Sequence, residues 1–68
     1  MMWSELRPND VLAGRGRYSA YTYLVLKKMA YDAVDVDWKV LDLSTGAVTC
    51  VRGDSTHMSD EVWEVFRP

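Results

Sequence analysis

Leu6-Arg7-Pro8-Asn9-Asp10-Val11-Leu12-Ala13-Gly14 is the stretch that decides how the chain begins to fold. Proline fixes its own φ and moves the preceding residue out of the helical region, so a helix that started at Met1 would stop before Pro8. The Asn9-Asp10 pair carries side chains that bond to nearby backbone and favour turns. Val11-Leu12 then predict a short apolar strand.

Two strands are predicted in the middle of the chain. The run Tyr21–Met29 is aromatic and apolar on both of its faces, which predicts a central strand, with a helix from Ser19 as the alternative. The run Val34–Val40 alternates strictly and is the clearest strand, with Trp38 on its apolar face. Because Leu41 and Leu43 then fall on its polar face, we expect a bulge near Val40, or cover on both faces.

A hairpin is predicted next. Ser44-Thr45-Gly46 has glycine where a three-residue loop needs a left-handed residue, and Ala47–Val51 is the returning strand. The segment Arg52–Thr56 is expected to end that strand. Ser59-Asp60 can begin one short helical turn, and the alternation of Val62–Phe66 favours a closing strand over a terminal helix.

Five short strands joined by short loops predict an all-β fold whose strongly bent antiparallel sheet closes on itself, because a flat sheet would expose its edges. The chain resembles the Src-homology-3-like small barrels, many of which begin with a Leu-x-Pro-Gly-Asp-x-Val entrance. The stretch Leu6–Val11 is similar, with Asn9 in place of the glycine. The resemblance implies one five-stranded antiparallel barrel over residues 1–68, with room for a short helical turn before the last strand. The entrance reports strand geometry and implies no activity.

Composition bounds the class of protein. The 68 residues are 49% hydrophobic and 26% charged, which is typical of one soluble globular domain. The one cysteine, Cys50, excludes an internal disulfide and a cysteine-based metal cluster, and favours a reducing compartment. Because no basic region followed by a long apolar run opens the sequence, we expect a cytoplasmic protein that does not bind membranes.

Charge is unevenly distributed along the chain. Residues 1–31 carry five basic and two acidic groups, whereas residues 32–68 carry three basic and eight acidic groups. Separate basic and acidic faces would result unless folding interleaves the two halves, which is the ordinary expectation for a small barrel.

A basic and aromatic loop is the first candidate binding site. Guanidinium and ammonium groups could meet phosphates while tyrosines stack on bases, as in small barrels that hold RNA or single-stranded DNA. The alternative is a solvated loop beside tyrosines that serve the core, which the negative net charge favours. The residues concerned are Arg15, Arg17, Tyr18, Tyr21, Tyr23, Lys27 and Lys28.

An acidic group is the second candidate. Asp35 and Asp37 share a strand face, with Asp32 and Asp42 on either side, and could hold a hard cation or imitate phosphates towards a basic partner. The spacing lacks the ligand loop of a calcium site. A solvated edge that discourages sheet aggregation is the simpler interpretation, and an acidic docking face for another protein is the other.

Other motifs carry less weight. Arg52-Gly53-Asp54 is an adhesion tripeptide without an extracellular context. Cys50 and His57 could pair as nucleophile and base, but no third orienting group is indicated, so a buried small hydrophobe and an exposed histidine are favoured. The sequence has no nucleophile elbow, phosphate loop or zinc spacing, so we expect neither an enzyme nor a cofactor. Trp38 is expected in the core, and Trp3 is expected to be exposed or buried by a partner, including a second copy of the chain.

The hypothesis that follows is a non-catalytic, cytoplasmic protein-binding module. By analogy with stand-alone small barrels, it is a small phage or mobile-element accessory protein that docks on a larger host protein. The alternative is a nucleic-acid-binding barrel that uses the basic and aromatic loop.

Overall fold

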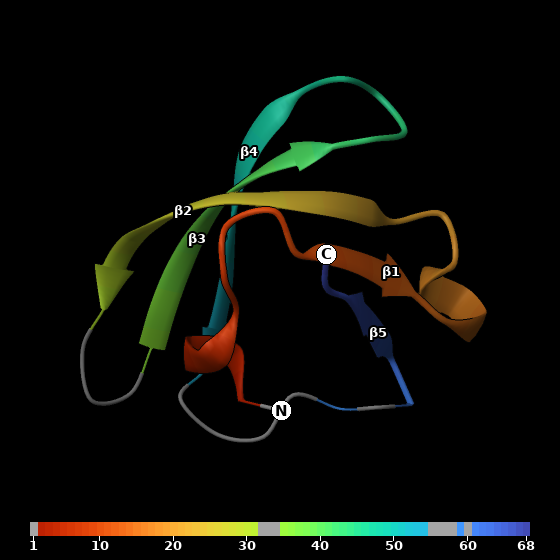
Figure 1. The fold of residues 1–68 in the computed structure, drawn as a ribbon. Coiled ribbons are helices and arrows are strands. Elements are labelled where there is room, and N and C mark those ends of the chain that lie inside the picture. Colours follow the sequence, from red (N-terminus) through yellow and green to blue (C-terminus); the bar gives the residue numbers. More distant parts are fainter. Residues whose placement is uncertain (1, 32–34, 55–58, 60) are drawn as a thin grey trace.

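One five-stranded antiparallel sheet makes up the fold of the computed structural model, which describes residues 2–31, 35–54, 59 and 61–68 (Figure 1). Its strands follow the order β4-β3-β2-β1-β5, and the described helices are short 3-10 turns. The prediction of an all-β fold is therefore confirmed. The elements are η1 (Trp3–Glu5), β1 (Val11–Gly14), η2 (Gly16–Tyr18), β2 (Thr22–Tyr31), β3 (Asp35–Asp42), β4 (Val48–Asp54) and β5 (Trp63–Phe66).

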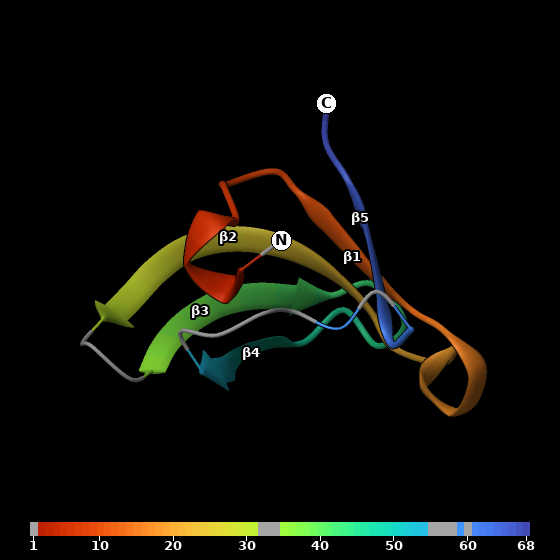
Figure 2. The same cartoon turned by 90° about the horizontal axis from the view of Figure 1, so that it is seen from below.

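The sheet is strongly bent and is not closed. β4 and β5 form its two edges, and they do not pair with each other among the described residues. Figure 2 shows β2 and β3 arching along their length. Bulges account for the bend of β2, where the register with β3 shifts between Val25 and Lys27 and again between Lys28 and Ala30.

The expected bulge lies on a different strand from the one predicted. β3 pairs regularly with β4 from Asp35 to Leu41, and the extra residue opposite Val40 belongs to β2. The bulge therefore does not return the leucines after Val40 to the inner face of β3. Leu41 stays on the outer face and is half-buried, while Leu43 lies beyond the strand and is exposed.

The core lies on the inner face of the sheet, which we define by the buried side chains that point to it. Val36, Trp38 and Val40 are buried, as the alternation of β3 predicts. Val25 of β2 and Leu12 of β1 join them from the neighbouring strands. All five are at most 2% exposed.

The N-terminal segment covers one end of this inner face. Leu6 is buried, and Trp3 packs against the core cluster. The Trp38 indole donates a hydrogen bond to the carbonyl oxygen of Trp3 at 3.0 Å, and the Trp3 ring meets that of Trp63 edge to face at 6.1 Å. The expectation that Trp3 is exposed is wrong, because the chain's own core half-buries it, while burial of its remaining surface by a partner stays a prediction.

The entrance turn is held by backbone bonds to β2. The Asn9 N–H donates to the Val25 carbonyl at 2.8 Å, and the Val25 N–H donates to the Asp10 carbonyl at 2.8 Å. Asn9 has φ of 76°, the left-handed conformation for which glycine is the usual residue. The 3-10 turn η1 ends at Glu5, so helical structure stops before Pro8 as predicted.

The hairpin and the final strand are also confirmed, with one correction. Gly46 has φ of 78°, as its loop position requires. β4 continues through Arg52–Asp54, so the expectation that the segment Arg52–Thr56 breaks the strand from its first residue is wrong. The Ser59 carbonyl accepts hydrogen bonds from the N–H groups of Val62 and Trp63, which makes a turn before β5. The predictions for Asp32, Val34, Ser55, Thr56, His57 and Asp60 lie outside the described residues.

Candidate functional site

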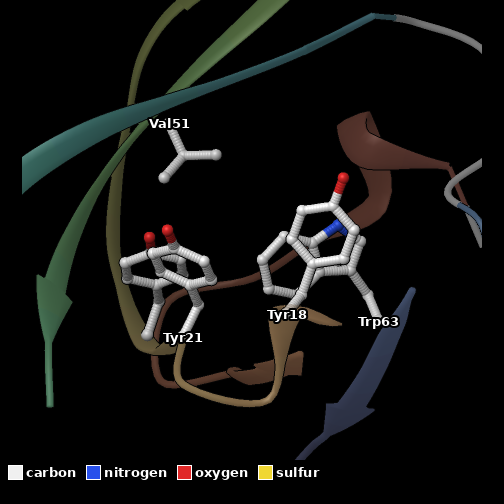
Figure 3. A pocket seen from close by; sticks show the side chains of 5 residues that line it. Tyr18, Tyr21, Val51 and Trp63 are labelled. Atoms are coloured by element: carbon white, nitrogen blue, oxygen red, sulfur yellow. The ribbon is translucent and has the colours of Figure 1, made fainter. Parts of the chain in front are cut away.

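The inner face forms an open pocket of about 220 Å³ beside the core, against which three of the residues that line it are packed. Its lining is aromatic apart from one valine. Figure 3 shows Tyr21 on one side, Tyr18 and Trp63 on the other, and Val51 across from the rings. The lining residues are Tyr18, Tyr21, Tyr23, Val51 and Trp63.

Strand alternation and register explain why these rings meet. Tyr23 lies two residues before the buried Val25, so it points to the same inner face. Its partner on β1 is Leu12, whereas Trp63 of β5 pairs with Gly14. Since Leu12 and Gly14 are two residues apart, Tyr23 and Trp63 share the inner face, with ring centroids 6.0 Å apart.

Gly14 lets Tyr18 reach the pocket. A Cβ at this position would overlap the backbone carbonyl of Tyr18, so only glycine allows η2 to fold this closely over the strand. The Gly14 N–H donates to the Tyr21 carbonyl at 2.8 Å, and the Tyr21 N–H donates to the Tyr18 carbonyl at 2.9 Å. These bonds fix both tyrosines next to each other.

The four rings form a closed circuit of neighbours. The centroid distances are 6.3 Å between Tyr18 and Tyr21, 6.2 Å between Tyr21 and Tyr23, and 6.3 Å between Tyr18 and Trp63. The 6.0 Å between Tyr23 and Trp63 closes it, and every pair lies in the range of favourable aromatic contacts. Tyr18 is 38% exposed and Tyr21 is 45% exposed, so solvent reaches the rings.

A carboxylate lies beside the circuit. Asp42 is the cross-strand partner of Tyr23, so the two side chains share a face. Burial raises the pKa of the Tyr23 hydroxyl, and electrostatic interactions with Asp42 and then with Tyr21 raise it further. The hydroxyl therefore stays protonated. One Asp42 oxygen accepts the Ser44 N–H at 2.9 Å and so fixes the carboxylate.

The basic loop contributes less free charge than its sequence implies. Arg15 forms an ion pair with Glu64 of β5 at 3.1 Å. Arg17 is exposed on η2, directly before Tyr18. Folding therefore brings basic groups of one half of the chain next to acidic groups of the other half, as we expect for a small barrel. The ion pair of Arg67 with Asp10, which also joins the two halves of the chain, is a second example.

The lysines of the predicted site lie elsewhere on β2. Lys27 pairs with Lys39, whose neighbours in β3 are buried, so both lysines point to the outer face. Lys28 lies over the Trp38 ring, with its Nζ 5.1 Å from the centroid and 3.4 Å from the Ser4 carbonyl. The structure therefore does not bring the lysines to the rings that line the pocket.

Of the acidic candidates, Asp35 and Asp37 lie on the outer face, away from the pocket, whereas Asp42 shares the inner face with Tyr23. Both oxygens of Asp37 bind Arg52 across the sheet, at 2.7 and 3.1 Å. Asp35 pairs with Asp54 at the far end of β3. Cys50, expected to be buried, is exposed on β4. No cluster of three potential metal ligands occurs among the residues that the structure describes.

Sequence reasoning placed Tyr18, Tyr21 and Tyr23 in one candidate site but missed Trp63 and Val51. These two come from the edge strands β5 and β4, and their meeting depends on the order and pairing of the whole sheet. The one local signal for Trp63 is its place in an alternating strand that ends the fold.

These features define a small all-β domain with one bent antiparallel sheet and an open aromatic pocket. Comparison with known proteins finds no matching family model, no matching curated protein and no matching solved structure. Of the helices in the described ranges, none is long and apolar enough to cross a membrane.

Proposed function

We propose that the chain is a non-catalytic protein-binding module whose docking surface is the aromatic pocket. The observation that carries this proposal is the circuit of four rings around an open hollow, with Tyr18 and Tyr21 partly exposed. Tyrosine and tryptophan supply large, stiff contact areas, and they are enriched among the residues that dominate binding energy at protein interfaces.

The strand order supports a half-closed barrel of the Src-homology-3-like kind. β1 pairs with both β2 and β5, while β2, β3 and β4 follow one another. Val51 of one edge strand and Trp63 of the other line the same pocket, so it lies where the two edges approach. A partner that binds there would cover apolar surface that an open sheet leaves in contact with water.

The proposal includes a cytoplasmic location and a biological role for the module. A single, exposed thiol at Cys50 supports a reducing compartment such as the cytoplasm. A chain of 68 residues that docks on a larger protein suits the role of a phage or mobile-element accessory protein. This role rests on analogy with small stand-alone barrels.

Nucleic-acid binding is the alternative, and Arg17 beside Tyr18 is the observation that favours it. The charge near the rings is nevertheless low, because Glu64 neutralises Arg15 and Asp42 adds a negative group. Phosphate contacts supply most of the affinity of nucleic-acid-binding proteins. A peptide surface of a protein therefore fits this pocket better than a phosphate backbone does.

The test is capture of a partner that depends on the pocket. Tagged wild-type protein is expected to retain a stoichiometric partner from its native cells, and Tyr21→Ala is expected to lose it. Phe66→Ala is the matched control, since Phe66 is also an exposed aromatic, at 52%, but does not line the pocket. Equal retention of the same partner by Tyr21→Ala would overturn the proposal.

A salt titration separates the two functions. Binding to short RNA or single-stranded DNA should weaken steeply with salt and with Arg15→Ala plus Arg17→Ala if nucleic acid is the ligand. The protein-binding proposal expects no complex with either nucleic acid at low salt, and a salt-sensitive complex lost in that double variant would support the alternative.

A further inference from the structure

We propose that the aromatic pocket receives the side-chain cation of a lysine on the partner, with methylated lysine preferred. This inference rests on the proposed function and adds the chemistry of the ligand. The features that carry it are the ring circuit of Tyr18, Tyr21, Tyr23 and Trp63 and the carboxylate of Asp42 beside it.

The ring spacing suits a cation. Neighbouring centroids in the circuit are at most 6.3 Å apart, so the midpoint of the four rings lies within about 6 Å of every centroid. That is the range over which the quadrupole of an aromatic face attracts a positive charge. A single cation held near this midpoint would lie within that distance of all four centroids, and tryptophan and tyrosine attract a cation where they present their faces to it.

The pocket has room for this group. Its volume of about 220 Å³ far exceeds the about 10–15 Å³ that one water molecule needs. It is open to solvent on the side of Tyr18 and Tyr21, which are 38% and 45% exposed. A long side chain can thus enter from a partner that remains outside the sheet.

The charges around the pocket favour a cation over an anion. Asp42 shares a face with Tyr23 and is held by the Ser44 N–H. Burial is the main cause of the raised pKa of the Tyr23 hydroxyl in the pocket wall, and the negative charge of Asp42 adds to it. The Arg15 charge is offset by Glu64, which leaves Arg17 on η2 as the nearby charge that opposes a cation.

The apolar lining favours a methylated ammonium over an unmodified one. An unmodified lysine ammonium is compact and strongly hydrated, and it brings three donors that need acceptors. The lining offers ring faces, Val51 and tyrosine hydroxyls instead. Quaternary ammonium groups need no acceptor, and aromatic cages are the known means of recognising them.

The experiment compares three small probes on the whole chain. N-acetyl-trimethyllysine methylamide carries the cation, a neutral isostere has tert-butyl in place of trimethylammonium, and N-acetyl-lysine methylamide is the unmethylated form. Calorimetric titration should give the trimethylated probe about 3- to 30-fold higher affinity than the neutral isostere, with the unmethylated probe between them.

Two variants and a control locate the effect. Asp42→Asn keeps an oxygen for the Ser44 N–H but removes the charge, and should weaken the cationic probe severalfold while leaving the neutral isostere unchanged. Arg17→Ala should leave binding of the cationic probe unchanged or tighten it. Phe66→Ala should bind all three probes like the wild type, since Phe66 does not line the pocket.

Each outcome decides one of the two proposals. If the neutral isostere binds as tightly as the cation, or if no probe binds, the inference on lysine is wrong. Partner capture then judges the docking function independently, because its readout is the loss of a retained protein in Tyr21→Ala. If the cation binds and Asp42→Asn weakens it selectively, the inference stands.

Discussion

Arg67 binds both carboxylate oxygens of Asp10, although 57 residues separate them in the chain. Its Nε lies 3.0 Å from Oδ1 and its Nη2 lies 2.9 Å from Oδ2. The same Nη2 donates to the Glu5 carbonyl at 3.1 Å, and the Arg7 N–H donates to the Asp10 carboxylate at 2.8 Å. We call these hydrogen bonds of Arg67 and Asp10 the clasp. The clasp joins the residue after β5 to the entrance turn, and thus holds the final strand beside β1.

Breaking the clasp should destabilise the fold. Asp10→Asn removes the charge that accepts the Arg67 hydrogen bonds at a fully buried position, while Arg67 itself stays one-third exposed to water, so we expect a loss of about 1.5–3 kcal/mol in the free energy of unfolding by urea. Glu64→Gln is the control, because its pair with Arg15 is exposed and should change stability by at most about 0.5 kcal/mol. Equal effects of the two substitutions would contradict this role for the clasp.

The clasp should also make stability depend on pH. The hydrogen bonds from Arg67 hold the pKa of Asp10 below its ordinary value of 3.8, against the opposing effect of burial. The unfolded chain therefore binds a proton more readily, so the contribution is fully present above that value and is lost as the pH falls through the lower, folded pKa. Urea midpoints measured from pH 6 to pH 2 should fall at the acid end, and fall less steeply in Asp10→Asn.

The entrance turn should tolerate glycine but not alanine at position 9. Asn9 has φ of 76°, which costs a residue with a Cβ roughly 1–2 kcal/mol, less for asparagine. We expect Asn9→Gly to stay within about 0.5 kcal/mol of the wild type and Asn9→Ala to lose about 1 kcal/mol. Thermal unfolding measures both, and the same stability for the two variants would show that the turn adopts a different conformation.

Gly53 should not tolerate a side chain, because it packs directly against the Trp3 ring. A Cβ at Gly53 would overlap the Trp3 ring, so Gly53→Ala must displace the tryptophan from the core. We expect a loss of about 1–3 kcal/mol and a change in tryptophan fluorescence. Cys50→Ala, at an exposed position of the same strand, should change neither by a measurable amount.

The strands and the centre of the core could be predicted from local patterns. Val36, Trp38 and Val40 follow a strict alternation, and Gly46 lies where the hairpin needs a left-handed residue, so no long-range contact was required. Trp3 was misplaced because its burial depends on the space above Gly53, in a strand 50 residues away.

The candidate site could be predicted only in part. Strict alternation places Lys27 on the same face as Tyr21 and Tyr23, but the bulge after Val25 turns it outwards. Trp63 joins Tyr18 through the pairing of β5 with β1, which depends on the whole order of the sheet. Local periodicity contains neither the bulge nor the strand order.

Mapping where the trimethylated probe binds tests the pocket most directly. In a ¹H–¹⁵N spectrum, the indole N–H of Trp63 should shift on titration, and the probe's methyl protons should show nuclear Overhauser contacts with the rings of Tyr18 and Tyr21. The Trp38 indole, bonded to Trp3 in the core, should not move. Shifts confined to the outer face around Asp37, with Trp63 unchanged, would contradict a binding site in the aromatic pocket.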